Sequence, residues 1–417
     1  MIEVGTAVVD ITPKPGLLLA GFAARSEPAI GTHDALTVRA IVVNDTAVVV
    51  ADVIGLHHEM SERIRKACVL PDDHVIIAAL HNHGGPVSMA GRLSLPSDQD
   101  YLHQLEQACI AAIDQAAAAR RPATWSVGLG GNPDVARNRR HPGGPVDSAV
   151  PIIRIRDAEG RMIAVITSYA CHPVVLGADN RLWTADYPHF VRRHLEEAYP
   201  GAMALFMTGC CGDTNTGHSA HASITLAANP DRTFATAERL GNRIGAAAVA
   251  ADEHPCGDEA VASNKVISLS FARRETEPVG VLARRWQDEM ATAETGRRAL
   301  LKYWIDWARL IAPLEPQPIA ARVTVFNWGG VAIAAMPGEI FAETSLSVRR
   351  ALGAETPAVV IGLAEDGPGY IPPASEFAFG GYEVDEAHRY YGAPAGFAPG
   401  SSEALAAAAI AQWPLHH

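Results

Sequence analysis

Apolar stretches of two lengths alternate along the chain and predict an α/β fold. Short runs rich in Val, Ile and Ala predict strands at 35–43, 46–54, 74–80, 123–129, 151–156, 162–170 and 202–208. Longer amphipathic segments between them predict helices at 58–69, 99–119, 187–198 and 232–251. This alternation favours large mixed central sheets flanked by helices, a fold that collects functional side chains in loops at the C-terminal ends of strands.

The segment 276–311 departs from this alternation. An apolar stripe on a long helix, or on a hairpin of helices, is predicted by the spacing of Leu300, Trp304, Trp307 and Ile311. We interpret the segment as a helical insertion within a single domain that spans residues 1–417. Packing of the stripe on the core is favoured over a lid that covers a substrate.

The pattern of strands and helices resumes after this segment. Residues 320–326 and 331–336 predict two paired strands joined by a turn at 327–330. A helix is expected after Pro337-Gly338-Glu339, and a last strand is expected at 358–363. A Gly- and Pro-rich segment then leads to an Ala-rich helix near the end of the chain.

Composition narrows the classes of function. Of the 417 residues, 48% are hydrophobic and 19% are charged, which is typical of a globular protein. The formal net charge of −12 argues against nucleic acid as a partner. The N-terminus lacks the pattern of a signal peptide, no long apolar run predicts a membrane span, and the six cysteines show no C-x-x-C spacing. We therefore expect a cytoplasmic protein with a small-molecule substrate, and the sequence leaves open whether it forms a homo-oligomer.

Two histidine motifs each follow a predicted strand directly. In the first motif, His81 and His83 occupy positions i and i+2, so in an extended chain both rings can face one cavity. The second motif contains His172. Paired loop histidines are often hydrogen-bonded structural residues, and the chain holds rival pairs, His57-His58 and His218 with His221.

Glu339 supplies a carboxylate at a similar position, after the predicted strand 331–336. Two imidazoles and a carboxylate from separate strands are a frequent ligand set of catalytic zinc, which keeps one position open for water or substrate. The sequence therefore predicts a zinc site that includes His81, His172 and Glu339.

A series of short motifs also runs along nearly the whole chain. In order, they are Val9-Asp10-Ile11-Thr12-Pro13, Gly21-Phe22, His33-Asp34, His81-Asn82-His83-Gly84-Gly85-Pro86, Asn138-Arg139, Tyr169-Ala170-Cys171-His172-Pro173, Gly212-Asp213, Pro337-Gly338-Glu339, Gly369-Tyr370-Ile371-Pro372 and Gly381-Tyr382-Glu383. In this order the chain resembles the catalytic N-terminal domain of the neutral/alkaline, non-lysosomal ceramidases. It is expected to lack their additional C-terminal domain.

The resemblance implies a zinc ion held by His81, His172, Glu339 and Tyr370. It also implies that His83 lines the site and that Arg139 polarises the group under attack. Zinc acidifies its bound water and polarises a carbonyl, so this chemistry suits the residue types. Without the resemblance, Tyr370 would be interpreted as a loop tyrosine packed beside Pro372.

The loop after Gly212 departs from the family pattern. The family carries a serine associated with catalysis, and Asn215 stands at that position. Since an amide is no useful nucleophile, either Thr214 or Thr216 replaces the serine, or water activated by the metal attacks directly, which we favour. Asn215 would then donate a hydrogen bond to the substrate or to the developing oxyanion, and Asp213 would orient a histidine.

The sequence thus predicts a zinc-dependent hydrolase that cleaves an amide bond of a small soluble substrate. His83 would pass a proton to the leaving amine. The other predicted catalytic residues are Arg139, Asn215 and Asp213, and the predicted substrate contacts are Asn138, Thr214 and Thr216. A lactonase or esterase acting on a sugar-derived or other small metabolite is the nearest alternative, because the same chemistry serves these bonds. A non-catalytic binding protein is a further alternative, because the serine is missing.

Overall fold

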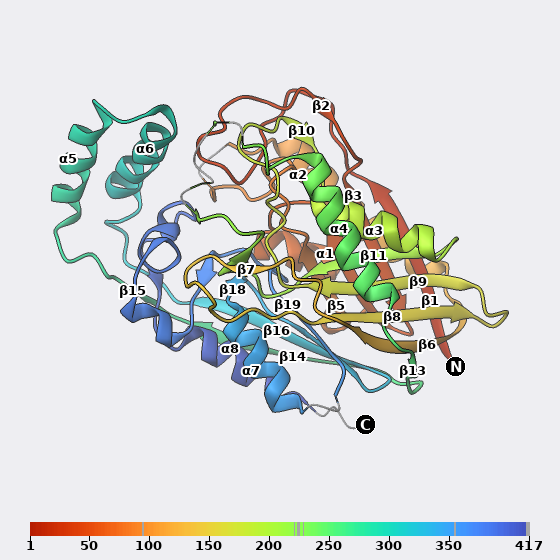
Figure 1. The fold of residues 1–417 in the computed structure, drawn as a ribbon. Coiled ribbons are helices and arrows are strands. Elements are labelled where there is room, and N and C mark those ends of the chain that lie inside the picture. Colours follow the sequence, from red (N-terminus) through yellow and green to blue (C-terminus); the bar gives the residue numbers. More distant parts are fainter. Residues whose placement is uncertain (94–95, 221, 223–225, 228, 354–355, 414–417) are drawn as a thin grey trace.

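A computed structural model describes residues 1–93, 96–220, 222, 226–227, 229–353 and 356–413. His221, a member of one rival histidine pair, lies outside these residues. Two β-sheets stack face to face at the centre of the molecule, and helices cover their outer faces (Figure 1). The predicted α/β architecture of large mixed sheets flanked by helices is therefore confirmed.

The larger sheet contains the N-terminal half of the strands. Its members are β1 (Ile2–Asp10), β3 (Thr37–Val43), β4 (Thr46–Ala51), β5 (Val75–Ala79), β6 (Arg121–Gly130), β8 (Val150–Asp157), β9 (Met162–Tyr169), β11 (Met203–Thr208) and β13 (His254–Pro255). The strand order is β11-β9-β8-β6-β1-β3-β4-β5, with β13 paired to β6. Neighbours are antiparallel except for β9–β11 and β4–β5, which are parallel pairs at the two edges.

The smaller sheet is built from β14 (Ala260–Leu269), β16 (Ile319–Trp328), β17 (Val331–Ala335) and β19 (Ala358–Ile361), in that order. Only the pair β17–β19 is parallel. Side chains on successive residues of a strand point to opposite faces. Phe326, Trp328 and Ile333 accordingly pack in the cluster between the two sheets, whereas Val323 and Val325 face the helices on the outer side.

Helices cover the outer faces of both sheets. On the larger sheet lie α1 (His58–Ala67), α2 (Gln99–Ala118), α3 (Tyr187–Ala198) and α4 (Phe234–Val249). The smaller sheet is covered by α7 (Ala342–Leu352) and α8 (Ser401–Ile410). The pair α5 (Val279–Met290) and α6 (Thr295–Leu310) lies beside these layers (Figure 1).

Short elements tie the loops at the strand ends together. They are β2 (Gly31–Thr32) paired with β10 (Leu182–Trp183), β7 (Arg137–Asn138) with β12 (Thr214–Asn215), β15 (Phe271–Ala272) with β21 (Gly396–Phe397), and β18 (Glu339–Ile340) with β20 (Tyr370–Ile371). Short 3-10 helices occur at Asp72–His74, Ala374–Ala378 and Ala387–Arg389, and a π-helical turn occurs at Tyr382–Glu386.

The segment 276–311 forms the two antiparallel helices α5 and α6 rather than one long helix. Three residues of its apolar stripe, Leu300, Trp304 and Trp307, are buried together with Trp286 of α5. Leu300 also lines a cavity, so the preference for packing on the core over a lid stays a prediction. The interpretation of this segment as an insertion within a single domain stays a prediction.

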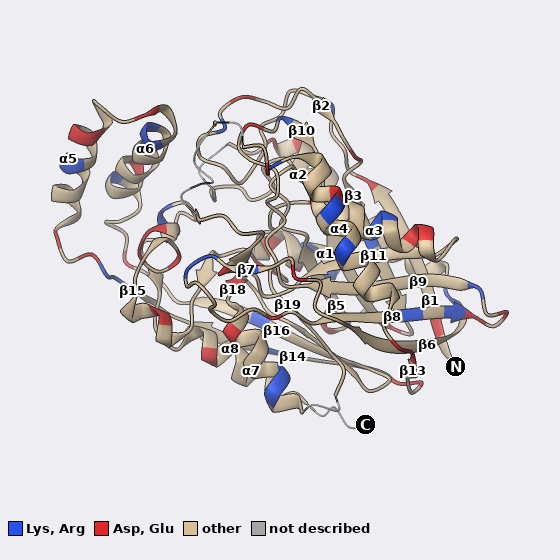
Figure 2. Cartoon of the chain, viewed as in Figure 1, with Lys and Arg blue, Asp and Glu red and all other residues tan. Residues whose placement is uncertain are grey.

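The sequence predicts no membrane-spanning segment and, from its net negative charge, no nucleic-acid partner. Among the described residues, no helix combines the length and the apolar character that a membrane crossing requires. Basic and acidic positions are interspersed along the ribbon, for example on α3, α4 and α5 (Figure 2). This mixture does not concentrate positive charge on those helices.

Candidate metal centre

His81 enters the candidate site just beyond the end of β5. Its backbone has φ of +69°, and its N–H donates to the carbonyl oxygen of Val53. The side-chain Nδ1 lies 2.6 Å from the carbonyl oxygen of Ile54. Because a carbonyl oxygen only accepts, Nδ1 carries the proton and Nε2 keeps its lone pair.

His172 follows β9 and is oriented in the same way. Its Nδ1 lies 2.6 Å from the carbonyl oxygen of Cys211 and 3.0 Å from that of Thr214. Nε2 therefore also keeps its lone pair, and it lies 2.9 Å from Oε2 of Glu339. The centroids of the His81 and His172 rings are 4.9 Å apart.

Glu339 arrives from the smaller sheet on the short strand β18. The preceding Gly338 has φ of +81°, and a Cβ there would lie 2.9 Å from the carbonyl oxygen of Gly369. Glycine thus permits the close approach of β18 to β20, which places Glu339 opposite Tyr370. Oε2 of Glu339 lies 3.2 Å from Nε2 of His81, and Oε1 accepts a hydrogen bond from the hydroxyl of Tyr391.

These three side chains fit a metal ion. Potential ligand atoms of His81, His172 and Glu339 all lie within 4.8 Å of one another, and each side chain is at most 2% exposed. With both Nδ1 atoms protonated, two nitrogen lone pairs and a carboxylate oxygen face one point, an arrangement that a cation relieves. Zinc bonds of about 2.0–2.2 Å place tetrahedral ligand atoms roughly 3.3 Å apart, close to the separations observed here. The cluster can therefore bind a metal.

The protonation states suit metal binding. Burial acts to raise the pKa of Glu339, but the adjacent His81 and His172 outweigh it and hold that pKa well below its usual range. Burial, reinforced by Arg139, lowers the pKa of His172. The carboxylate is thus ionised and this imidazole neutral at neutral pH, which are the forms that coordinate a metal.

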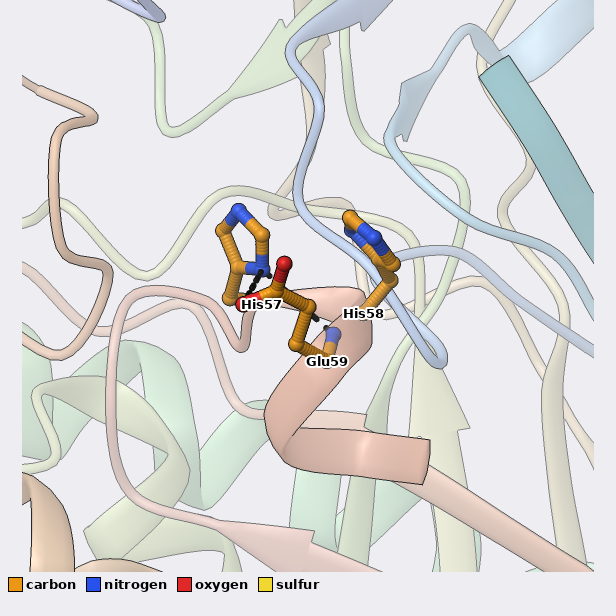
Figure 3. Close-up of side chains that lie close together, drawn as sticks. All are labelled: His57, His58 and Glu59. Atoms are coloured by element: carbon orange, nitrogen blue, oxygen red, sulfur yellow. Dashed lines mark hydrogen bonds and ion pairs between the residues drawn. The ribbon is translucent and has the colours of Figure 1, made fainter. Parts of the chain in front are cut away.

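A second group of metal-ligand residues lies at the start of α1. His57, His58 and Glu59 come close together there (Figure 3). The side chains are 26%, 53% and 68% exposed, and Nδ1 of His57 accepts the backbone N–H of Glu59 as the helix cap. Burial and then Arg92 lower the pKa of His57. The N-terminus of a helix and a neighbouring arginine both disfavour a cation, so capping explains His57.

His83 lies between the cluster and a cavity. Its ring is 5.3 Å from that of His81 and 4.7 Å from that of Phe22. Neither ring nitrogen has a hydrogen-bond partner in the described part of the chain. Gly21, with φ of +98°, makes room for the ring, since a Cβ there would overlap it. Burial, followed by His81, lowers the pKa of His83 well below its usual value, so the imidazole is neutral.

Arg139 is fixed beside the cluster by several acceptors. Nε donates to Oε1 of Glu383 at 2.8 Å, and Nη2 donates to the Gly212 carbonyl and to the Tyr370 hydroxyl, both at 3.0 Å. Burial would lower its pKa, but Tyr370 and Glu383 raise it well above the usual value. Arg139 is therefore an oriented, permanently charged group.

Tyr370 bridges Arg139 and the histidines. Its hydroxyl lies 3.5 Å from Nε2 of His172, and burial together with Glu339 raises its pKa well above the usual value. The phenol lies next to the cluster, and its role as a fourth ligand stays a prediction.

A cavity of about 60 Å³ leads from the cluster toward α6. It is lined by Gly21, Phe22, Ala23, His83, Leu93, Arg139, His172, Val174, Ala220, Leu300, Tyr370, Tyr382, Glu386 and Tyr390. Its walls are mainly apolar and aromatic, with few polar groups, which is typical of a small-molecule site.

Asp213 and Asn138 hold the loops behind Arg139 together. Asp213 accepts hydrogen bonds from the Asn138 amide and from the backbone N–H of Ala342, both at 2.8 Å. Asn138 also donates to the carbonyl oxygen of Pro145. Neither side chain is among those that line the cavity. These contacts are structural, and the predicted catalytic and substrate-binding roles stay predictions.

The loop residues after Asp213 also use their side chains internally. Asn215 accepts the backbone N–H groups of Gly217 and His218 and donates to the His218 carbonyl. The hydroxyl of Thr214 donates to the Ala170 carbonyl, and Thr216 is half-buried. None of the three predicted residues Thr214, Asn215 and Thr216 is among those that line the cavity, so their predicted roles remain untested.

Several cavity residues were not identified from the sequence. Tyr390 and Glu386 line the cavity, and Tyr391 binds Glu339. They lie in the Gly- and Pro-rich segment, where no apolar periodicity marks their direction. The density of tyrosines at 382–391 is the one signal that points to a site there.

Fold and site together define an α/β protein with a buried His-His-Glu cluster at the ends of strands. The crystal structure of neutral ceramidase from Pseudomonas aeruginosa has this fold, with a TM-score of 0.75 and 17% identity over 100% of this chain and 75% of that chain. A ceramidase complexed with C2 gives a TM-score of 0.73 and 16% identity over 98% and 75% of the two chains. Neither the scan against protein-family models nor the search of curated proteins finds a match. The ceramidase-like fold that the motifs predicted is confirmed.

Proposed function

We propose that this protein is a zinc-dependent hydrolase that cleaves an amide bond of a small substrate. The observation that carries the proposal is the convergence of His81, His172 and Glu339 next to a cavity that His172 and the charged Arg139 line. The ceramidase fold of the structural neighbours supports hydrolysis, and the resemblance of the motifs to ceramidases favours an amide.

The proposed metal ligands are His81, His172, Glu339 and Tyr370. When bound, zinc polarises a carbonyl group and acidifies water. Arg139 is oriented toward the cluster before substrate arrives, so it would stabilise negative charge on the attacked group without reorganisation. His83 lies beside His81, and both of its ring nitrogens are free of hydrogen bonds to described residues, so it would pass a proton to the leaving amine.

Direct attack by water is favoured over a covalent intermediate. The described residues that line the cavity include no serine, threonine or cysteine. Cys210 and Cys211 are fully buried, and burial raises the pKa of both thiols, which makes them poor nucleophiles. Thr214 already donates its hydroxyl proton to a carbonyl.

The test combines metal analysis with a panel of substrates. Purified protein is expected to hold about one zinc per chain and to hydrolyse 4-nitroacetanilide faster than matched ester and lactone substrates relative to their uncatalysed rates. His172→Ala should lose both zinc and turnover while retaining its circular dichroism spectrum. His58→Ala, which changes a histidine of the exposed group, serves as the matched control and should retain both.

Other outcomes discriminate the alternatives. Turnover that is greatest on lactones or esters would replace the amidase proposal with a lactonase or esterase. Bound metal without turnover of any substrate would favour a binding protein. Full activity of the His172→Ala variant would refute the metal centre.

A further inference from the structure

One buried carboxylate holds two consecutive arginines beside the cavity. Oε1 of Glu383 accepts a hydrogen bond from Nε of Arg139 at 2.8 Å, and Oε2 accepts one from Nη1 of Arg140 at 2.6 Å. The side chain of Glu383 is 3% exposed, so water screens these charge-assisted bonds only weakly. Each oxygen of this one carboxylate thus orients one guanidinium group.

Glu383 is ionised in this setting. Burial acts to raise its pKa, but Arg139 and Arg140 outweigh burial and hold that pKa below its usual value. Its side chain is not among those that line the cavity beside the cluster, whereas Arg139 is. Any effect of Glu383 on a ligand in this cavity therefore passes through Arg139.

The turn that carries Glu383 is anchored from outside the cavity. This π-helical turn spans Tyr382–Glu386. Within it, Asp385 accepts the backbone N–H of Gly381 and Nε of Arg274, both at 2.8 Å. Glu383 is therefore in place before a ligand arrives.

The three nitrogens of the Arg139 guanidinium differ in their partners. Nε donates to Glu383, and Nη2 donates to the Gly212 carbonyl and to the Tyr370 hydroxyl. Nη1 has no hydrogen bond to a described residue, and it is not among the fully buried atoms that lack one. Because the guanidinium group is planar and rigid, fixing Nε and Nη2 also fixes the direction of Nη1. Nη1 is thus the donor that remains for a ligand.

We infer that Glu383 is a positioning residue of this site: by holding Nε of Arg139, it directs Nη1 toward the cavity, where Nη1 binds the carbonyl oxygen of the substrate. The inference rests on the proposed hydrolase for the reaction, but the alignment of Arg139 itself requires only binding. A donor aligned in advance stabilises the negative charge that develops on this oxygen more than it stabilises the neutral carbonyl. Loss of the alignment should therefore lower kcat more than it raises KM.

Glu383→Gln tests this role with a matched control. An amide has a single acceptor oxygen, so it cannot accept hydrogen bonds from both arginines. The kcat for 4-nitroacetanilide is expected to fall about 10- to 100-fold, with KM within about threefold of the wild-type value. Glu376→Gln is the control, because Glu376 is also buried and accepts Nε of Arg140 at 2.7 Å but has no hydrogen bond to Arg139. It should retain kcat within about twofold.

Glu383→Asp keeps the negative charge between the two arginines and shortens the side chain by one methylene group. It should also lower kcat about tenfold, and it decides the question even if Glu383→Gln does not fold. In the Arg139→Ala background, Glu383→Asp should change kcat by less than about twofold, since Glu383 acts through Arg139. An equal loss in both backgrounds would overturn the inference.

A binding measurement separates this inference from the proposed function. Butyrate represents the carboxylate product of amide hydrolysis, and isothermal titration calorimetry measures its affinity without turnover. Glu383→Asp should weaken butyrate binding about tenfold, whereas Glu376→Gln should leave it unchanged. This pattern in a protein that hydrolyses no substrate would refute the hydrolase and support the positioning role. Hydrolysis by the wild-type protein, with kcat and butyrate affinity unchanged in Glu383→Asp, would refute the positioning role and leave the hydrolase intact.

Discussion

At the scale of single residues, the geometry of the cluster depends on hydrogen bonds that hold its members from behind. Backbone carbonyls fix the rings of His81 and His172 through Nδ1. The Tyr391 hydroxyl does the same for Glu339, because it occupies Oε1 and leaves Oε2 facing both imidazoles. Such contacts raise metal affinity by reducing the freedom of the ligands.

Removal of the Tyr391 hydroxyl should therefore weaken metal binding without unfolding the protein. Tyr391→Phe is expected to lower zinc affinity about 10- to 100-fold, because Glu339 loses the bond that orients it. Competition with a chromogenic chelator measures the dissociation constant. Tyr303→Phe removes a hydroxyl from a half-buried tyrosine of α6 and should leave that constant within about twofold. Equal affinities of wild-type protein and Tyr391→Phe would contradict the expectation.

Asp186 links the stability of the fold to pH. It caps α3 from a buried position and accepts backbone N–H groups of Val175, Leu176 and Tyr187. Burial is the largest influence on its pKa and raises it from 3.8 to about 6. The folded protein therefore retains this proton to a higher pH than the unfolded chain does.

The sign of the effect follows from linkage. Well below pH 3.8 Asp186 is protonated in both states and costs nothing, whereas above about pH 6 its ionisation penalises the folded state. The stability of the wild-type protein relative to Asp186→Asn should therefore fall by on the order of 3 kcal/mol as pH rises between these limits. Urea unfolding of both metal-free proteins across this range measures the difference. A difference that does not vary with pH would contradict a raised pKa.

At the scale of elements, the contact between β1 and α2 depends on a glycine. A Cβ at Gly5 would overlap the carbonyl oxygen of Ala116, so the strand and the helix could not remain at their present separation. Backbone atoms cannot rotate away as a flexible side chain can. The close packing of α2 on the centre of the larger sheet therefore requires glycine at this position.

Gly5→Ala should destabilise the protein by about 1–3 kcal/mol through overpacking, as measured by urea unfolding. Gly131→Ala is the matched control, because a Cβ there has nothing within 4 Å, and it should change stability by less than about 0.5 kcal/mol. Zinc content should be the same in both variants, since neither glycine contacts the cluster. Equal stability of the two variants would show that β1 and α2 adjust more readily than their backbone contact indicates.

Burial explains which elements the sequence predicts well. Strands β4 and β5 lie between two layers, so every residue in them is buried, and each forms a continuous apolar run. Strand β1 was not predicted because several of its residues are exposed or only partly buried, including Glu3 and Val8. Strand β14 was also missed, since it forms the edge of the smaller sheet and most of its residues are only partly buried. Both strands are defined by distant pairing partners.

At the scale of the whole molecule, the positions of His81, His172 and Glu339 could be inferred from the ends of strands, but their surroundings could not. His81 and His172 follow apolar strands that the sequence marks clearly. Tyr391 lies 52 residues from its partner Glu339, and Glu386 lies in a segment without periodicity. The packing of the C-terminal loops places Tyr391 against Glu339 and Glu386 on the cavity wall, and no local pattern of residues predicts this packing.

The cluster also joins the two sheets, which gives a last expectation. His81 and His172 follow strands of the larger sheet, whereas Glu339 follows β17 of the smaller sheet. A metal bound to all three opposes separation of the sheets and binds only the folded state. Zinc at 1,000 times its dissociation constant should therefore stabilise the protein by about 4 kcal/mol relative to the chelated form. Thermal melts in zinc and in EDTA measure this shift. The His81→Ala variant should show little of it, and an equal midpoint of the wild-type protein in both solutions would mean that the three side chains hold no metal.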